Sequence, residues 1–166
     1  MVATIMEKIT LLVKKLQNKT AEYRHLQHLT LTQGEMFGWD HTACAITYDA
    51  AAPHAAAYLL HELGHALLKH SGYRYDIELL KMERAAWDTA ITVASEYGVA
   101  IHEDVIEDAL DSYRDWLHNR SLCPGCGATG MQTAPGSYTC VACNTSWRVN
   151  EARTCALRRY RTKKRP

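Results

Sequence analysis

The sequence predicts an α+β fold in which a mostly helical domain with a short sheet precedes a small cysteine-rich domain. Over the first 120 residues, apolar side chains recur mainly at helical spacing, and one run looks like a strand. Beyond Arg120 that spacing stops, and four cysteines appear among prolines, glycines and threonines. A chain of 166 residues has room for one core and a small appendage, so we expect two domains, 1–120 and 121–166.

Four helices are expected in the first domain, over residues 3–28, 54–70, 76–97 and 102–119. Pro53 suits the first turn of the second helix, Ser71-Gly72 is typical of its end, and Gly98 closes the third. The run Ala43-Cys44-Ala45-Ile46-Thr47-Tyr48 predicts a short strand, and one or two further strands fit before it.

The composition, with 47% hydrophobic and 22% charged residues, is typical of a globular protein and excludes a disordered or coiled-coil chain. No apolar run approaches the roughly 20 residues that cross a bilayer, and the first residues lack the pattern of a secretory signal. We therefore expect a cytoplasmic protein with no membrane partner. Its six cysteines are then reduced thiols or metal ligands.

The second helix contains the motif His61-Glu62-Leu63-Gly64-His65. Two imidazoles one turn apart lie on the same helix face, so both can reach one zinc ion, and Glu62 stands beside them to act on a water molecule. This His-Glu-x-x-His pattern predicts a catalytic zinc site. His70, five residues after His65, is off that face and is expected to be a surface or helix-terminal residue.

A hydrolytic zinc site needs three protein ligands and one open position, so a third ligand is required. Glu83 is the best candidate, because its helical neighbours are apolar and a buried unpaired carboxylate would cost several kcal/mol. Its competitors Asp76 and Glu78 lie near the helix start, where carboxylates are favoured as caps. We expect His61, His65 and Glu83 to hold zinc.

With that ligand set, Glu62 is the general base of peptide-bond hydrolysis. It takes a proton from the attacking water and later gives it to the leaving amine. Several side chains remain open as stabilisers of the oxyanion, among them Tyr48, Tyr73, Tyr75 and His102.

The second domain holds two cysteine pairs, Cys123-Pro-Gly-Cys126 and Cys140-Val-Ala-Cys143, separated by thirteen residues. Four thiolates at this spacing can surround one tetrahedral zinc ion. A segment this short cannot bury enough surface to fold without such a link, so we expect a zinc ribbon with a structural zinc. The expected cofactors are therefore two Zn²⁺ ions, one catalytic and one structural.

Charge is distributed unevenly along the chain. Residues 148–166 carry eight Arg or Lys against one Glu, whereas the preceding residues are acidic overall. A basic tail after a ribbon with Tyr138 and Tyr160 favours contact with single-stranded nucleic acid. The alternatives are a solvated tail and a ribbon that only supports the catalytic domain. The candidate contact residues are Arg148, Arg153, Arg158 and Arg159.

Cys44 lies on the predicted strand just before the catalytic helix. A thiolate there could occupy the fourth position of the zinc, displace the water and hold the enzyme latent. The alternative is a small buried apolar residue. The latent-enzyme hypothesis predicts that Cys44→Ala raises basal proteolysis. Cys155 is most simply a free thiol in the tail.

Residues 40–120 resemble the ImmA/IrrE family of bacterial metallopeptidases, through Ala45-Ile46-Thr47-Tyr48-Asp49, His61-Glu62-Leu63-Gly64-His65-Ala66-Leu67-Leu68 and Glu83-x-x-Ala86-x-x-x-Ala90. The resemblance implies a minimal zincin-like fold of the gluzincin type, with zinc on the two histidines and Glu83 and with Glu62 catalytic. Family members typically cleave a helix-turn-helix transcriptional repressor. Because no such motif is evident in this chain, the repressor would be a separate polypeptide.

The appended ribbon is similar to the CapP branch, whose peptidases are paired with CapH repressors in anti-phage (CBASS) operons. This resemblance implies activation by single-stranded DNA, in a phage or DNA-damage response. A SprT-like protease of DNA-crosslinked proteins is an alternative. Resemblance to that group implies a third His ligand shortly after the motif, and no His occurs here between His70 and His102. A non-enzymatic nucleic-acid-binding module with a structural His pair is the alternative from another class.

Overall fold

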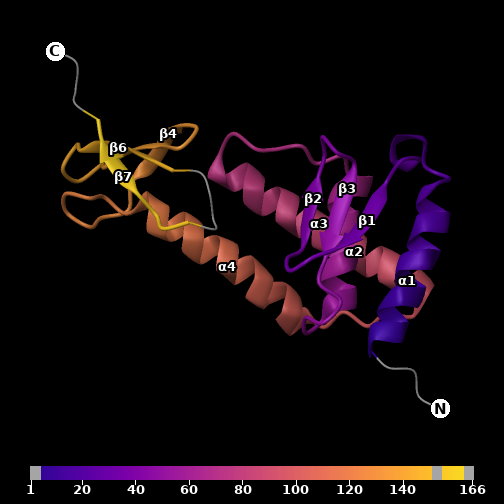
Figure 1. The fold of residues 1–166 in the computed structure, drawn as a ribbon. Helices are drawn as coiled ribbons and strands as arrows, with labels where there is room; N and C mark the ends of the chain where they lie inside the picture. Colours follow the sequence, from indigo (N-terminus) through magenta and orange to yellow (C-terminus); the bar gives the residue numbers. More distant parts are fainter. Residues whose placement is uncertain (1–4, 151–154, 163–166) are drawn as a thin grey trace. The chain divides into compact units, whose positions relative to one another are not determined.

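The computed structural model describes residues 5–150 and 155–162, which form a mixed α+β structure of four α-helices and two sheets (Figure 1). The chain divides into two compact units, one of Met1–Ser71 with Met82–Ile106 and one of Gly72–Lys81 with Glu107–Pro166. Within the described ranges, no helix is long and apolar enough to cross a membrane.

The sheet of the first unit has three short strands, β1 (Thr30–Gln33), β2 (Gly38–Asp40) and β3 (Ala45–Tyr48). The central strand β3 pairs parallel with β1 and antiparallel with β2. Ile46 in β3 is fully buried, which anchors the sheet in the core. The strand was predicted to begin at Ala43 and begins two residues later, because Cys44 has a positive φ of 50° that a strand does not allow.

The first helix, α1 (Ile5–Thr20), is shorter than the predicted span of 3–28. Its apolar stripe is buried as expected, through Ile9, Leu12, Val13 and Leu16. After Thr20 the chain tightens into turns, and a 3₁₀ helix, η1 (Arg24–Leu26), follows. Leu26 is 1% exposed and lies past the end of the α-helix. The apolar pattern therefore extends beyond α1, which is why the predicted helix is too long.

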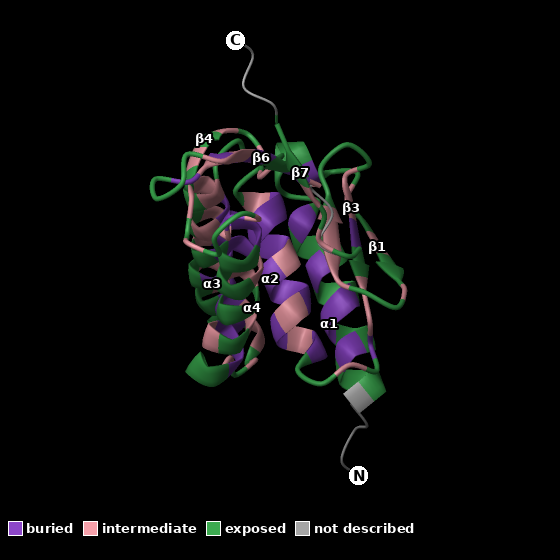
Figure 2. Ribbon diagram, turned by 90° about the vertical axis from the view of Figure 1, so that its left-hand side faces the viewer, coloured by how far each residue is buried: buried purple, intermediate pink, exposed green. Residues whose placement is uncertain are grey.

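The second helix, α2 (Ala55–Leu67), is buried along most of its length, as Figure 2 shows. It begins after His54, whose backbone is left-handed, so Pro53 precedes the helix instead of opening its first turn. It ends at Leu67 and not at 70, because the chain turns at Lys69 with a φ of 58°. The predicted stop at Ser71-Gly72 is therefore wrong by about one turn.

The two remaining helices, α3 (Asp76–Tyr97) and α4 (Glu103–Ser121), confirm the predicted spans closely. Gly98, with a φ of 64°, follows the last residue of α3 in the left-handed conformation typical of a helix end. At the start of α3, the Glu78 carboxylate accepts hydrogen bonds from the backbone N–H groups of Arg74 and Tyr75. Both helices contribute residues to both units.

The second unit contains an antiparallel sheet of β4 (Met131–Ala134), β5 (Ser137–Thr139), β6 (Ser146–Val149) and β7 (Arg159–Arg161), in that order. Its core is a stacked pair of rings, Tyr138 and Trp147, with centroids 5.6 Å apart. Gly130 lies against the Trp147 ring so closely that a Cβ there would collide with it. The unit is therefore small but densely packed around one tryptophan.

Candidate metal centres

Three metal-ligating side chains meet inside the first unit. Helix α2 presents His61 and His65 one turn apart, and α3 presents Glu83 to them. The Glu83 Oε2 atom lies 3.1 Å from His61 Nε2 and 3.5 Å from His65 Nε2, and the two Nε2 atoms are 3.1 Å apart. All three residues are buried. The structure thus brings together the three residues that the sequence singled out.

These distances fit one small cation. Zinc bonds of about 2.0–2.1 Å in tetrahedral geometry place neighbouring nitrogen and oxygen ligands about 3.3 Å apart. The observed separations lie within a few tenths of an ångström of that value. Three protein ligands also leave a fourth position for water or substrate, as catalytic zinc sites do.

Glu78, the competitor for the third ligand, does not belong to this group. Its carboxylate caps the start of α3, where hydrogen bonds from the backbone of Arg74 and Tyr75 lower its pKa. Asp76 likewise lies at the helix start, and its Oδ2 atom accepts the Tyr138 hydroxyl. Both acidic residues therefore have local roles, as expected of carboxylates at a helix N-terminus.

His70 lies just past the end of α2, which agrees with a terminal residue, but it is half-buried instead of lying at the surface. Its Nδ1 atom lies 2.9 Å from Nδ1 of His65, and its carbonyl oxygen accepts a hydrogen bond of 2.8 Å from the Trp39 indole. Helical spacing missed this contact because α2 ends at Leu67, and the turn at Lys69 folds His70 back onto the helix. His70 orients the ring of His65 from the side opposite Glu83.

The electrostatics of the first centre suit metal ligation and base catalysis. Burial raises the pKa of Glu62 to about 7, although His65 and a hydrogen bond from the Trp39 backbone N–H act in the opposite direction. Burial also lowers the pKa of His61, which keeps its imidazole neutral as a ligand must be. For Glu83, hydrogen bonds from the two histidines outweigh burial and hold the pKa at about 2.

Cys44 stands apart from this centre. It lies in the turn before β3, and its thiol donates to the carbonyl oxygen of His25 at 3.8 Å. Over the described residues, the group of ligand atoms around His61 contains only His65 and Glu83 besides it. The arrangement therefore gives the predicted fourth ligand no support.

The four paired cysteines form a second cluster, in the turns of the second unit. Cys123 Sγ lies 3.6 Å from Cys143 Sγ, and Cys126 Sγ lies 3.6 Å from Cys140 Sγ. Four sulfurs bonded to one zinc at about 2.3 Å are about 3.8 Å apart, so the cluster also fits a tetrahedral ion. Gly127, with a φ of 75°, forms the tight turn of the first pair. Four sulfur ligands close the coordination sphere, as in structural sites.

Hydrogen bonds favour the thiolate form of two of the four cysteines, whereas the neighbouring thiols of Cys143 and Cys140 raise the pKa of Cys126 to about 12. The Thr145 hydroxyl and backbone lower the pKa of Cys143 to about 6, and the Gly125 N–H lies 3.3 Å from the Cys123 sulfur. Zinc binds the thiolate form, so these donors favour ligation.

The basic residues of the tail are partly engaged within the second unit. Arg159 donates to the Asn119 carbonyl, and Arg161 donates to the Pro124 carbonyl at 2.9 Å. Arg148 lies in β6, and the backbone N–H of Arg158 donates to Asn150 Oδ1. Arg153, also predicted to contact nucleic acid, lies outside the described residues.

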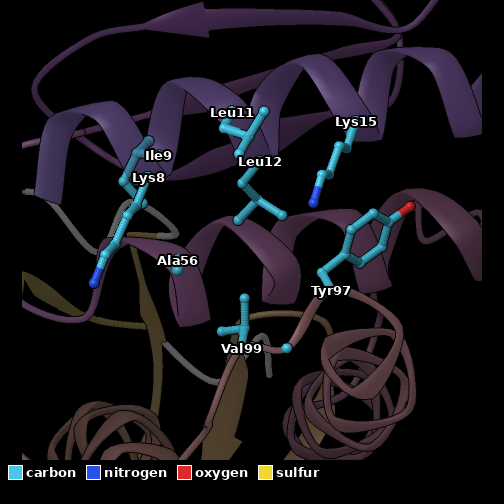
Figure 3. A pocket seen from close by; sticks show the side chains of 9 residues that line it. Lys8, Ile9, Leu11, Leu12, Lys15, Ala56, Tyr97 and Val99 are labelled. Atoms are coloured by element: carbon cyan, nitrogen blue, oxygen red, sulfur yellow. The ribbon is translucent and has the colours of Figure 1, made fainter. Parts of the chain in front are cut away.

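A separate hollow of about 320 Å³ lies between α1 and the end of α3, and Figure 3 shows its apolar lining. Leu12 and Val99 point into it, and Lys8 and Lys15 stand on the α1 side. No residue of the metal centres lines it.

Comparisons with known proteins give this chain no relative. No protein-family model matches it, and no curated protein or solved structure is significantly similar to it. The two clusters of metal-ligating side chains are thus the features from which a function can be argued.

Proposed function

We propose that this protein is a zinc-dependent endopeptidase with a zincin-like catalytic unit and a structural zinc ribbon. The observation that carries the proposal is the buried group of His61, His65 and Glu83, whose ligand atoms fit one tetrahedral ion beside Glu62. An acid with a pKa of about 7 next to a three-ligand metal site is typical of general acid–base catalysis.

The proposal assigns a role to each side chain of the first centre. His61, His65 and Glu83 would hold the zinc ion, which would supply a Lewis acid for the scissile carbonyl and for the attacking water. Glu62, held by the Trp39 backbone N–H, accepts the proton of the attacking water and returns it to the leaving nitrogen. His70 fixes the orientation of His65.

The substrate that we propose is a separate helix-turn-helix repressor, with single-stranded DNA as activator. This finer assignment rests on the resemblance of the His61–His65 motif, Glu83 and the ribbon to ImmA/IrrE peptidases of the CapP branch. In this proposal the four-cysteine zinc holds the ribbon together and takes no part in hydrolysis, because its coordination sphere is complete.

The test is incubation of the zinc-loaded protein with a purified helix-turn-helix repressor, with and without single-stranded DNA. Glu62→Gln is the matched control, because it removes the base and keeps the three ligands. We expect cleavage by the wild type alone, with the cut site given by mass spectrometry of the products. The incubation with DNA tests the activator separately. Cleavage that does not respond to DNA would support the peptidase activity and contradict the proposed activation by DNA.

The opposite result is equally clear. If the wild type, with both zinc sites filled, cleaves neither this repressor nor a diverse peptide library, the proposed activity is wrong. Equal cleavage by wild type and Glu62→Gln would mean that a contaminating protease is responsible.

A further inference from the structure

The second unit has a partly open cavity that contains no residue of either metal cluster. It has a volume of about 310 Å³, near the lower end of small-ligand sites. Its lining contains two arginines and no acidic residue: Gly72, Tyr73, Arg74, Arg120, Pro135 and Gly136. The cavity wall is therefore electropositive.

The side chain of Arg120 is almost completely buried, with 1% of the residue exposed. Its Nε and Nη1 atoms are buried and have no hydrogen-bond partner among the described residues. A buried charge is strongly unfavourable unless it is paired and hydrogen-bonded, and arginine cannot lose its proton to escape that cost. The described residues therefore supply no acceptor for these two nitrogen atoms.

Aromatic rings hold the guanidinium in place. Its carbon lies 4.4 Å from the centre of the Trp116 ring and 5.9 Å from that of Tyr138. Stacking on ring faces orients the plane of the guanidinium and leaves its N–H groups at the edge free to donate. The Nε and Nη1 donors are thus held in place by the rings and have no partner among the described residues.

The carboxylate of Asp76, which bonds to Tyr138, is only partly engaged. Asp76 Oδ2 accepts the Tyr138 hydroxyl, and the Asp76 backbone N–H donates to Gln132 Oε1 at 2.8 Å. Its Oδ1 atom is buried without a partner, so Asp76 and Arg120 each keep unused hydrogen-bonding capacity. A water molecule between them is the simplest rival occupant.

We propose that this cavity binds a phosphate group, with Arg120 as the buried donor and Arg74 as the second cation of its lining. The planar guanidinium fork matches the oxygens of a tetrahedral oxyanion, and bidentate pairs of this kind are among the strongest hydrogen bonds in proteins. The phosphate is either a free ion or part of a nucleotide chain. The site does not depend on the proposed peptidase activity.

The experiment is thermal unfolding of the zinc-loaded full chain in rising sodium phosphate, against sodium chloride at matched ionic strength. A ligand that binds only the folded state raises the Tm in a saturable way. We expect that rise for the wild type with phosphate and not with chloride. Arg120→Met keeps an apolar side chain against Trp116 and removes the donors, so it should weaken apparent phosphate affinity at least about tenfold.

Two further variants keep the test decisive. Arg74 is exposed, so Arg74→Gln should fold even if Arg120→Met does not, and it should also weaken phosphate binding. Arg114→Gln is the matched control, because Arg114 lies on the same helix as Arg120 but pairs with Glu107 and Asp111. It should leave the phosphate response unchanged.

A second titration distinguishes the sources of phosphate. Binding of a short oligothymidylate that inorganic phosphate displaces, and that Arg120→Met abolishes, assigns the site to a nucleic-acid phosphate. Saturation by inorganic phosphate with no competition by the oligonucleotide assigns it to the free ion.

The proposal is overturned if phosphate acts no differently from chloride, or if Arg74→Gln and Arg120→Met respond like the wild type. An equal loss of stability in Asp76→Asn and Arg120→Met, with no phosphate effect, would identify a water-bridged ion pair instead.

Discussion

Gly64 of α2 lies directly against the backbone of Ala86 in α3. A Cβ atom at position 64 would collide with the Ala86 carbonyl oxygen and lie 3.1 Å from its Cα atom. Gly64 stands between His61 and His65 in the sequence, and Glu83 lies one turn before Ala86. The absence of a side chain at Gly64 therefore lets the two helices approach closely enough for one carboxylate to reach both imidazoles.

Gly64→Ala should destabilise the protein and weaken its first metal centre. Alanine is a better helix former than glycine by about 1 kcal/mol, so any loss of stability must come from the collision with Ala86. Overpacking of this kind costs about 1–3 kcal/mol. Urea unfolding measures the loss, and zinc titration should show weaker binding at the histidine centre with the cysteine centre unaffected.

Gly38→Ala is the control for this prediction. Nothing lies within 4 Å of a Cβ at Gly38, so the same substitution there should change stability by no more than about 0.5 kcal/mol. If Gly64→Ala is as stable as the wild type and binds two zinc ions with unchanged affinity, the close approach does not matter to the site.

Glu83→Gln should remove one of the two zinc ions. The amide keeps the size of the side chain but loses the charge that balances the cation, so zinc affinity at this centre should fall by more than about 100-fold. Glu78→Gln is a matched control on the same helix, because Glu78 caps the start of α3 and is not a member of the cluster. Metal analysis after dialysis should give one zinc per chain for the first variant and two for the second.

The sequence predicted the elements whose ends are marked by local chemistry. Helix α3 begins at Asp76 and ends before Gly98, as expected, because acidic residues at its start and a left-handed glycine at its end act within one turn. The group of His61, His65 and Glu83 was also predictable, since a buried carboxylate on an apolar stripe needs a partner.

Other features depend on tertiary structure and left no local signal. Leu26 continues the apolar pattern of α1 but lies in a 3₁₀ helix, so spacing alone could not place the end of α1. His70 contacts His65 only because the chain reverses at Lys69. The sequence pattern places Arg120 at the edge of a domain, whereas its burial against Trp116 and Tyr138 requires the folded ribbon.

While the first centre is free of metal, ionisation of Glu62 should lower the unfolding free energy of the protein as the pH rises. Its folded pKa of about 7 exceeds its ordinary value of 4.5, so between these values the unfolded chain releases a proton that the folded chain keeps. The unfolding free energy therefore falls across this window, by up to about 3 kcal/mol above pH 7. Glu62→Gln cannot ionise and should be more stable than the wild type at pH 8, with a much smaller difference at pH 5.

The measurement is urea unfolding of both proteins at these two pH values, each holding one zinc per chain. Adding a second equivalent of zinc should abolish the difference, because a nearby cation favours the ionised carboxylate. A difference that is equal at pH 5 and pH 8 would show that the pKa of Glu62 is not raised in the folded protein.

Cys126→Ser should unfold the ribbon while the first unit keeps its structure. The sheet of the second unit is small, and its core of Tyr138 and Trp147 is joined to the cysteine turns, so it depends on the zinc for stability. We expect loss of one zinc per chain and loss of ordered signals from Trp147 in NMR spectra. Cys44→Ser is the matched control, because the Cys44 thiol donates to the His25 carbonyl and belongs to neither ligand cluster of the described residues, so this variant should keep both zinc ions and the ribbon signals. Two zinc ions and an intact ribbon in Cys126→Ser would mean that the four sulfurs do not hold a metal together. Loss of zinc from Cys44→Ser would instead restore Cys44 as a ligand of the first centre.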